Sequence, residues 1–218
     1  TEITSDSNLV TQDLMTEIFD ILRLKSDIDF SKYKAATITR RIERRMTIKQ
    51  LTSLQDYLTL LFKDSYEVDV LGKELLIGVT RFFRDTEAFT YLKDFVIPKI
   101  VSESSSKKVI RAWVAACSSG EEAYSIAIMF EEEIRKQGIE QEVKVFATDV
   151  NSDAIAEASA GFYSADIEND INSNLLKRHF VKVNTGGYQV SQKIRHSVVF
   201  ATHNMLIDPP FSNIDFVS

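Results

Sequence analysis

The chain has one cysteine, Cys117, among its 218 residues. An internal disulfide framework is therefore excluded, and a lone thiol is typical of proteins from a reducing cytoplasm. Basic charge is scarce too, because 26 lysines and arginines face 32 aspartates and glutamates, for a formal net charge of −6. A polyanion-binding surface needs a surplus of lysine and arginine, so nucleic acid is not expected as the main partner.

Long apolar runs are also missing. No stretch approaches the roughly 20 apolar residues of a membrane-spanning helix, and no signal-peptide pattern opens the sequence. The three histidines, His179, His196 and His203, lack metal-ligand spacing and a cysteine partner. We therefore expect a cytoplasmic protein that inserts into no membrane and holds no metal.

The first 79 residues carry apolar side chains at helical spacing. The first stripe follows Thr11 and the third follows a Thr52-Ser53 start. The four stripes are Leu14, Ile18, Ile21 and Leu22; Ile38, Ile42 and Met46; Leu54, Tyr57, Leu58 and Leu61; and Val68, Leu71, Leu75 and Leu76. Short helices with short connections pack as a bundle, so we predict a small all-α domain over residues 1–79.

From residue 80 onward, strands and helices alternate, which predicts an α/β domain over 80–218 with a Rossmann-like parallel sheet. A helix capped by Asp85 or Thr86 runs through Phe95, with Pro98 near its middle or end, and a polar stretch over 102–108 leads to the first strand.

The remaining elements follow from periodicity and turn residues. They are a strand over 109–116, a helix over 121–137 ended by Gly138, a strand over 143–148, a helix over about 152–160, a hairpin of 180–183 with 188–190 around 185–187, a strand over 198–201 and the start of a strand over 214–217. The last strand lies at a sheet edge with little sequence left to cover it, so we expect the domain to be incomplete at its C-terminal end.

Residues 111–124 (RAWVAACSSGEEAY) combine an apolar strand, a turn of small residues and a helix start, which is the opening unit of a nucleotide-type site. The glycine fingerprint of dinucleotide folds is missing, since Gly120 is the one glycine of the turn. Glu121 and Glu122 would repel a phosphate, whereas a ligand with hydroxyl and cationic groups suits them. Favourable placement at a helix N-terminus explains one of these acids equally well.

Polar residues also follow two later strands. Asp149 ends the second strand, where a carboxylate can accept two ribose hydroxyls, and a turn or N-cap aspartate fits about as well. Asn204, with Met205 beside it, follows strand 198–201; an amide there can read an adenine edge, although a turn asparagine is commoner. Cys117 fits a small packing residue better than a nucleophile, because no histidine lies nearby in sequence.

A cluster of arginines stands on one side of a predicted helix: Arg40, Arg41, Arg44 and Arg45. They span an arc of about 140° at 100° per residue, opposite the apolar positions of that helix. Either a solvated helix face or a basic docking stripe explains them. Docking is somewhat favoured, because adjacent like charges cost helix stability.

Four motifs together resemble the CheR family, the chemotaxis-receptor glutamate O-methyltransferases that use S-adenosylmethionine. They are residues 79–85 (VTRFFRD), 116–127 (ACSSGEEAYSIA), 147–149 (ATD) and 204–205 (NM), and their order and spacing run through nearly the whole chain. Residues 29–34 (DFSKYK) with 40–46 (RRIERRM) look like the form fused to a CheB-type methylesterase in longer hybrid proteins. The resemblance implies two partners, the cytoplasmic helical bundle of a chemoreceptor and a methylesterase domain of the same parent chain.

The resemblance also implies roles for single residues. Arg84 is the implied catalytic residue, next to the methyl group; Glu121 holds the amino group of the cofactor or neighbouring polar atoms, and Asp149 its ribose. The implied cofactor-binding residues are Thr80, Arg84, Cys117, Gly120, Glu121, Asp149, Asn204 and Met205. The implied receptor-facing residues are Arg40, Arg41, Arg44 and Arg45.

Two departures from the family pattern stand out. The family continues past Ser218 with a Cys-Arg-Asn stretch, a later β-subdomain that can tether the receptor tail, and further strands, all expected to be absent here. Gly78 stands where many relatives carry asparagine, which leaves one polar contact open.

Two other functions fit parts of the pattern. A non-catalytic signalling module that binds S-adenosylmethionine or its product S-adenosylhomocysteine would carry the same motifs. An NAD-dependent oxidoreductase is disfavoured by the missing glycines and by the acids at the helix start.

Overall fold

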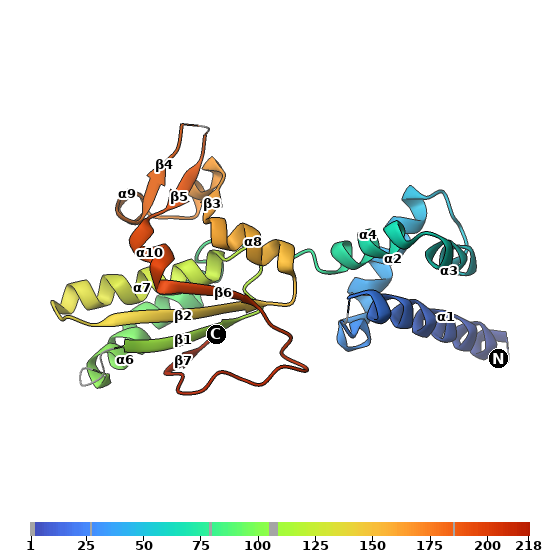
Figure 1. The fold of residues 1–218 in the computed structure, drawn as a ribbon, viewed down its shortest axis with the longest axis horizontal. Coiled ribbons are helices and arrows are strands. Elements are labelled where there is room, and N and C mark those ends of the chain that lie inside the picture. The colour runs from blue at the N-terminus through green and yellow to red at the C-terminus, as the bar shows by residue number, and fades with distance from the viewer. Residues whose placement is uncertain (1–2, 27, 79, 105–108, 185) are drawn as a thin grey trace. The chain divides into compact units, whose positions relative to one another are not determined.

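The computed structural model describes residues 3–26, 28–78, 80–104, 109–184 and 186–218 (Figure 1). The chain divides into two compact units, Thr1–Ile77 and Gly78–Ser218. Val79 of the predicted motif, part of the expected linker and Thr185 of the expected hairpin turn lie outside the described residues.

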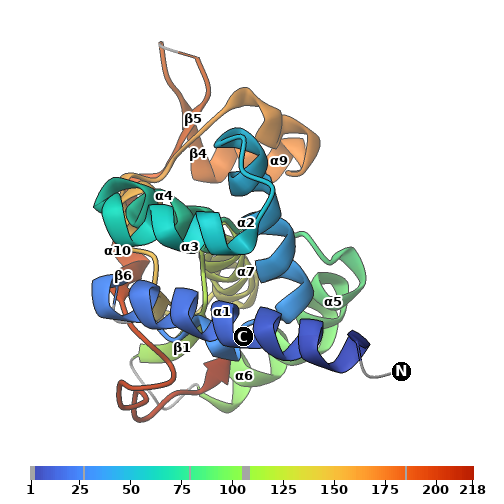
Figure 2. The same cartoon turned by 90° about the vertical axis from the view of Figure 1, so that its right-hand side faces the viewer.

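The first unit is a helical bundle, as the apolar stripes predict. It consists of α1 (Ile3–Ser26), a 3₁₀ turn over Phe30–Lys32, α2 (Ala35–Ile48), α3 (Leu54–Lys63) and α4 (Ser65–Leu75). α1 packs against α3 and α4, and α2 packs against α4 (Figure 2). Ser53 caps α3 as predicted. α1 begins before the predicted start at Thr11, because a nucleated helix extends at little cost through residues without an apolar stripe.

The second unit opens with a helix that differs from its prediction. Asp85 caps α5 (Thr86–Tyr91) as predicted, but a π-helical turn over Leu92–Val96 separates it from α6 (Ile97–Glu103). Pro98 lies in the first turn of α6. In an uninterrupted α-helix its ring would meet the carbonyl four residues earlier, and the wider π turn avoids that clash.

The main sheet is parallel, with strand order β6-β2-β1-β7. Its strands are β1 (Val109–Ala115), β2 (Glu142–Asp149), β6 (Val198–Thr202) and β7 (Phe216–Val217). Two connecting helices, α7 (Glu121–Gln137) and α8 (Ser152–Ala160), end at Gly138 and Gly161 in the left-handed conformation. β7 lies at an edge, as expected, and the predicted fold class, an all-α domain before an α/β domain, is confirmed.

A second, antiparallel sheet is inserted between α8 and β6. Its strand order is β3-β5-β4, from β3 (Phe162–Tyr163), β4 (Phe180–Lys182) and β5 (Tyr188–Val190). The neighbouring pieces are a 3₁₀ turn over Ala165–Asn169, α9 (Ser173–His179) and α10 (Gln192–Ser197). The hairpin of β4 and β5 was predicted. The third strand of this sheet, β3, was not predicted.

The core of the second unit lies between the main sheet and its helices. Alternate residues of β1 are buried, and α7, α8 and α10 contact β2 (Figure 1). Because the strands are parallel, the loops that follow β1, β2 and β6 leave the sheet at the same edge. None of the helices among the described residues is long and apolar enough to span a bilayer.

Candidate functional site

The loop after β1 has an unusual backbone. Ala116 and Ser118 have positive φ angles of 55° and 48°, and Gly120 has a φ of 93°. Left-handed conformations are costly for residues with a side chain, so the surrounding contacts must hold this loop. One such contact is the Cys117 amide, which donates to the Thr148 carbonyl at 2.9 Å.

Cys117 points into the core. Its side chain is buried, and burial raises the pKa of its thiol to about 12. A thiol of that pKa is protonated at neutral pH and is no nucleophile. Cys117 therefore packs in the core, as one of the two interpretations predicts. Its contribution to the loop is its backbone.

Gly120 allows three elements to meet. A Cβ atom built on it would lie 2.8 Å from the Cβ of Ala158 and 3.1 Å from the ring of Phe200. Both contacts are shorter than packed carbon atoms tolerate. The glycine thus lets α7, α8 and β6 approach one another behind the loop.

Asp149 joins three loops at this edge. One carboxylate oxygen accepts the Ser118 amide and the other the Asn151 amide, each at 2.8 Å, while its carbonyl accepts the His203 amide at 2.9 Å. The helix cap of α8 is Asn151, so Asp149 is a turn-forming residue and not the cap. Each carboxylate oxygen has a further lone pair, which can accept a ligand hydroxyl.

The two glutamates of the motif have different surroundings. The Ser119 hydroxyl donates to a carboxylate oxygen of Glu121 at 2.8 Å, and burial raises the pKa of Glu121, assisted by the nearby Glu157 and Asp170. Glu122 instead accepts the Ser218 hydroxyl beyond β7. Glu121 is therefore the acid that belongs to the loop.

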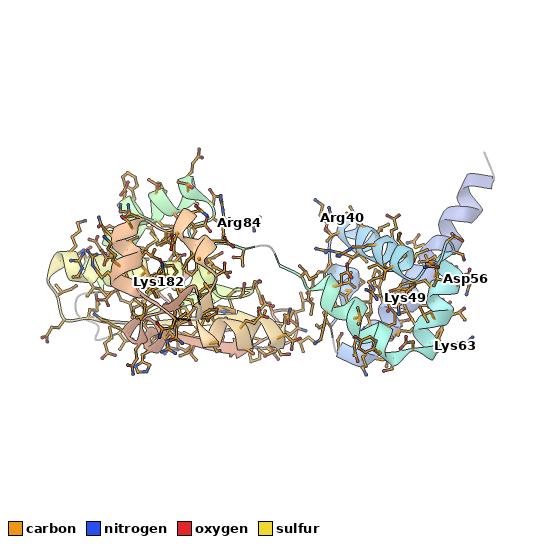
Figure 3. All side chains as sticks on the ribbon, turned by 90° about the horizontal axis from the view of Figure 1, so that it is seen from above. Arg40, Lys49, Asp56, Lys63, Arg84 and Lys182 are labelled. Carbon is orange, nitrogen blue, oxygen red and sulfur yellow. The ribbon has the colours of Figure 1, made fainter. Side chains whose placement is uncertain are left out.

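The segment before α5 lies against the first turn of α7. The Phe83 amide donates to the Ser125 hydroxyl at 3.2 Å, and that hydroxyl donates to the Glu121 carbonyl at 2.7 Å. Phe83 has a positive φ of 49°, a strained conformation for an aromatic residue. The exposed Arg84 follows directly (Figure 3), and Thr80 is half-buried in the same segment.

Gly78 is also close to the loop. A Cβ atom on it would lie 2.6 Å from the Ser118 hydroxyl oxygen. A larger residue at this position would require the Ser118 side chain to move. A glycine at this position thus allows the Gly78 segment to approach the Ser118 loop closely.

Asn204 and Met205 follow β6 in a turn. The Asn204 side-chain oxygen accepts the Leu206 backbone amide at 3.0 Å, and the Asn204 backbone amide donates to the Asp208 carboxylate at 2.7 Å. Met205 is 57% exposed. Asn204 therefore has the turn role that the sequence left as one alternative. The bond from the His203 amide to Asp149 places this turn beside the loop after β1.

Comparison with known proteins identifies the family of this domain. Residues 78–218 match the CheR methyltransferase SAM binding domain, and residues 13–76 match the CheR methyltransferase all-alpha domain. The chain belongs to the CheR methyltransferase family. The cofactor of this fold is therefore S-adenosylmethionine, as the motifs predicted.

Relatives of several lengths match the chain. It is 41% identical over 201 residues to an uncharacterized 104.1 kDa protein of Rhodobacter capsulatus, covering 92% of the chain and 21% of that protein. It is 27% identical over 208 residues to a chemotaxis protein methyltransferase of Borreliella burgdorferi, covering 93% and 74%. It is 30% identical over 189 residues to chemotaxis protein methyltransferase 2 of Vibrio cholerae, covering 85% and 65%. The chain thus spans about a fifth of the Rhodobacter protein.

The CheR cofactor fits the residues at the sheet edge. It carries no phosphate and has a cationic methionine end. The sheet edge presents Glu121 and Asp149, and residues 116–121 include no basic side chain. The turn before Glu121 consists of small residues, of which Ser118 and Ser119 are half-buried. No group of His, Cys, Asp and Glu among the described residues is arranged for a metal ion.

The arginines of α2 do not form one exposed stripe. Arg45 donates two bonds to the fully buried Glu67, at 2.9 and 2.7 Å, and its side chain is 12% exposed. Arg44 pairs with Glu74 at 2.7 Å yet is 59% exposed, and Arg41 lies 4.0 Å from Glu74. Arg40 lies on the surface (Figure 3). Arg45 and Arg41 are instead turned toward buried carboxylates of α4, and receptor docking by this helix stays a prediction.

A cavity of about 780 Å³ is lined by residues of α5, α7 and α9. Its lining includes Phe83 and Phe89 near α5, Met129 and Glu132 of α7, and Leu175 of α9. None of the predicted site residues lines it. Its mixed charges indicate no ligand class, so the chemistry is assigned to the sheet edge.

Sequence reasoning missed two residues that hold the loop. Ser125 connects Phe83 to α7, and its one signal was a hydroxyl within an apolar helical run. Tyr163 donates from its hydroxyl to the Ser119 carbonyl at 2.7 Å. No sequence pattern marks Tyr163, because a two-residue strand has no periodicity.

Proposed function

We propose that this chain transfers methyl groups from S-adenosylmethionine to glutamate side chains of chemotaxis receptors, forming methyl esters for sensory adaptation. The arrangement that carries the proposal is the joining of three loops through Asp149, with Glu121 and the Arg84 segment beside them. The chemotaxis names of the Borreliella and Vibrio relatives support the substrate class.

Each side of the site has a role in the proposal. The Asp149 carboxylate accepts ribose hydroxyls with the lone pairs that Ser118 and Asn151 leave over. Glu121 would hold the amino group of the methionine end, Thr80 would contact that end near the methyl group, and Asn204 with Met205 would flank the adenine. The half-buried Ser118 and Ser119 are the residues of the turn that a ligand would approach.

The chemistry needs little from the protein beyond placement. When bound, the cofactor supplies a methyl group activated by a sulfonium. A substrate glutamate is ionised at pH 7 and needs no general base. Arg84 pairs with that carboxylate and aligns it for in-line attack, while the surrounding loops exclude water. The pairing must be transient, because a tight ion pair would reduce the nucleophilicity of the carboxylate.

The receptor-binding surface of the proposal lies on the helical unit. Arg40 and Arg44 are the arginines of α2 that remain exposed, and they would contact carboxylates of the receptor's cytoplasmic bundle. A methylesterase domain in the same parent chain is a further proposed partner, and a cytoplasmic location fits both.

The test has two parts. Isothermal titration of the full chain with S-adenosylmethionine and S-adenosylhomocysteine measures cofactor binding. Transfer of a radiolabelled methyl group to receptor cytoplasmic fragments, released as methanol by base, measures glutamate ester formation. Binding without transfer, in a parent protein as well, would favour the non-catalytic binding module and reject the proposed activity.

A further inference from the structure

Tyr163 connects the small antiparallel sheet to the cofactor loop. It pairs with Tyr188 across β3 and β5, and its hydroxyl donates to the Ser119 carbonyl at 2.7 Å. Burial raises the pKa of that hydroxyl, so it is a protonated donor at neutral pH.

The ring of Tyr163 is held in place by its neighbours. The ring centroid of Phe82 lies 4.8 Å away and that of Tyr124 lies 6.2 Å away, both edge-on. Gly187 lies against the Tyr163 backbone, because a Cβ atom there would lie 2.4 Å from the Tyr163 carbonyl. The hydroxyl is thus presented to the loop by packed aromatic rings and backbone.

Ser119 is the residue through which such a contact acts on the site. Its hydroxyl donates to Glu121, and it stands between Ser118 and Gly120, which have φ angles of 48° and 93°. The Ser118 amide in turn donates to Asp149. Residues with a side chain rarely adopt this backbone conformation by themselves, so the loop depends on tertiary contacts.

We propose that Tyr163 is a positioning residue for cofactor binding. Its hydroxyl anchors the Ser119 peptide, which directs the Ser119 hydroxyl to Glu121 and the Ser118 amide to Asp149. The antiparallel sheet is thereby the frame of the cofactor loop. The proposal rests on the proposed function, because both concern the same site.

A pair of tyrosines makes the test specific. Tyr163→Phe removes the hydroxyl and keeps the ring. Tyr124→Phe is the matched control, because the Tyr124 hydroxyl is also buried and donates to a backbone carbonyl, that of Ala158 in α8, at 2.8 Å. Each variant loses one buried hydrogen bond, so their melting temperatures should fall by similar amounts.

The two variants should differ in ligand binding. In the full chain, titration with S-adenosylhomocysteine should give a dissociation constant about fivefold to tenfold higher for Tyr163→Phe, corresponding to one lost hydrogen bond, and less than about twofold higher for Tyr124→Phe. Ser119→Ala, which removes the donor to Glu121, should weaken binding as Tyr163→Phe does.

A second measurement needs no cofactor. Amide hydrogen exchange over residues 116–124 of the ligand-free chain should be faster in Tyr163→Phe than in Tyr124→Phe. Equal binding and equal exchange in the two tyrosine variants would overturn the proposal. If the unmodified chain binds no S-adenosylhomocysteine, the proposed function fails, and the exchange comparison still decides whether Tyr163 anchors the loop.

Discussion

Asp149 uses one carboxylate for two tasks. It satisfies the Ser118 and Asn151 amides and still offers lone pairs to a ligand. We predict that Asp149→Ala weakens S-adenosylmethionine binding and lowers the free energy of unfolding by about 1–3 kcal/mol, because two partly buried amides lose their acceptor. Titration calorimetry and urea unfolding measure the two effects.

The control for Asp149 separates these effects. Asp149→Asn keeps an acceptor for one of the two amides and turns its NH2 toward the other, so it should lose less stability than Asp149→Ala and still bind the cofactor more weakly. A folded Asp149→Asn protein with unchanged affinity would show that the residue serves the turn alone.

Arg84 follows a strained residue and is exposed beside the loop. We predict that Arg84→Ala in a longer parent protein lowers turnover roughly a hundredfold, because the substrate carboxylate loses its orientation. Arg84→Lys should recover part of the rate, since it keeps the charge without the planar fork. Turnover and cofactor affinity are measured together, and an unchanged turnover in Arg84→Ala contradicts the role.

Among the helices, α2 is attached to α4 by a buried ion pair. Glu67 accepts from Arg45, from Lys49 at 2.9 Å and from the Tyr57 hydroxyl at 3.0 Å. We predict that Arg45→Met destabilises the first unit by about 3 kcal/mol, because Glu67 remains buried with fewer partners. Arg40→Met, at an exposed position of the same helix, should change the free energy of unfolding by less than about 0.5 kcal/mol. Urea unfolding of both variants checks this, and equal values would show that the pair contributes nothing.

The ion pairs between α2 and α4 also limit which arginines can be changed in a test of receptor docking. Reversing Arg45 would damage the bundle, and a carboxylate in place of Arg44 would face the buried Glu74, so the informative variant is Arg40→Glu with Arg44→Gln. We predict that it lowers receptor methylation at least tenfold at low salt, through charge repulsion, while cofactor affinity stays unchanged. Reversal of the exposed Lys63 on α3 (Figure 3) is the control. Methylation equal to that of the unmodified protein would exclude the α2 surface.

At the scale of the whole molecule, the carboxyl of Glu132 in the second unit makes the folded state sensitive to acid. Burial by itself would raise the pKa of Glu132, but bonds from Arg135, Arg178 and His179 outweigh it and lower the value from 4.5 to about 2. A carboxyl whose pKa is depressed by folding contributes stability above its unfolded pKa and loses it as the pH falls toward the folded one.

The resulting prediction concerns stability against pH. The free energy of unfolding should decline between pH 4.5 and about pH 2, and Glu132→Gln should show a shallower decline over that range. Urea unfolding at several pH values measures the difference between the two proteins. Identical slopes would show that the Glu132 cluster is not the source.

Elements with strong local signals were predicted closely. α7 runs over Glu121–Gln137 and ends at Gly138, as its periodicity and glycine indicate. The short pieces β3, α9 and α10 were missed, because two to seven residues carry too little periodicity to be distinguished from a loop. The π turn before α6 was also missed, because it relieves a clash between the Pro98 ring and the preceding turn, and local periodicity does not report such a clash.

Local chemistry in the sequence was enough to place Gly120, Glu121 and Asp149 at the ends of neighbouring strands, because parallel strands deliver their following loops to one edge. Only the tertiary structure decided which side chains hold that edge and which arginines stay exposed. Tyr163 reaches Ser119 from the antiparallel sheet, and Glu67 of α4 draws Arg45 into the bundle. Both contacts join residues far apart in the chain, and burial, which depends on the packed neighbours, makes them strong.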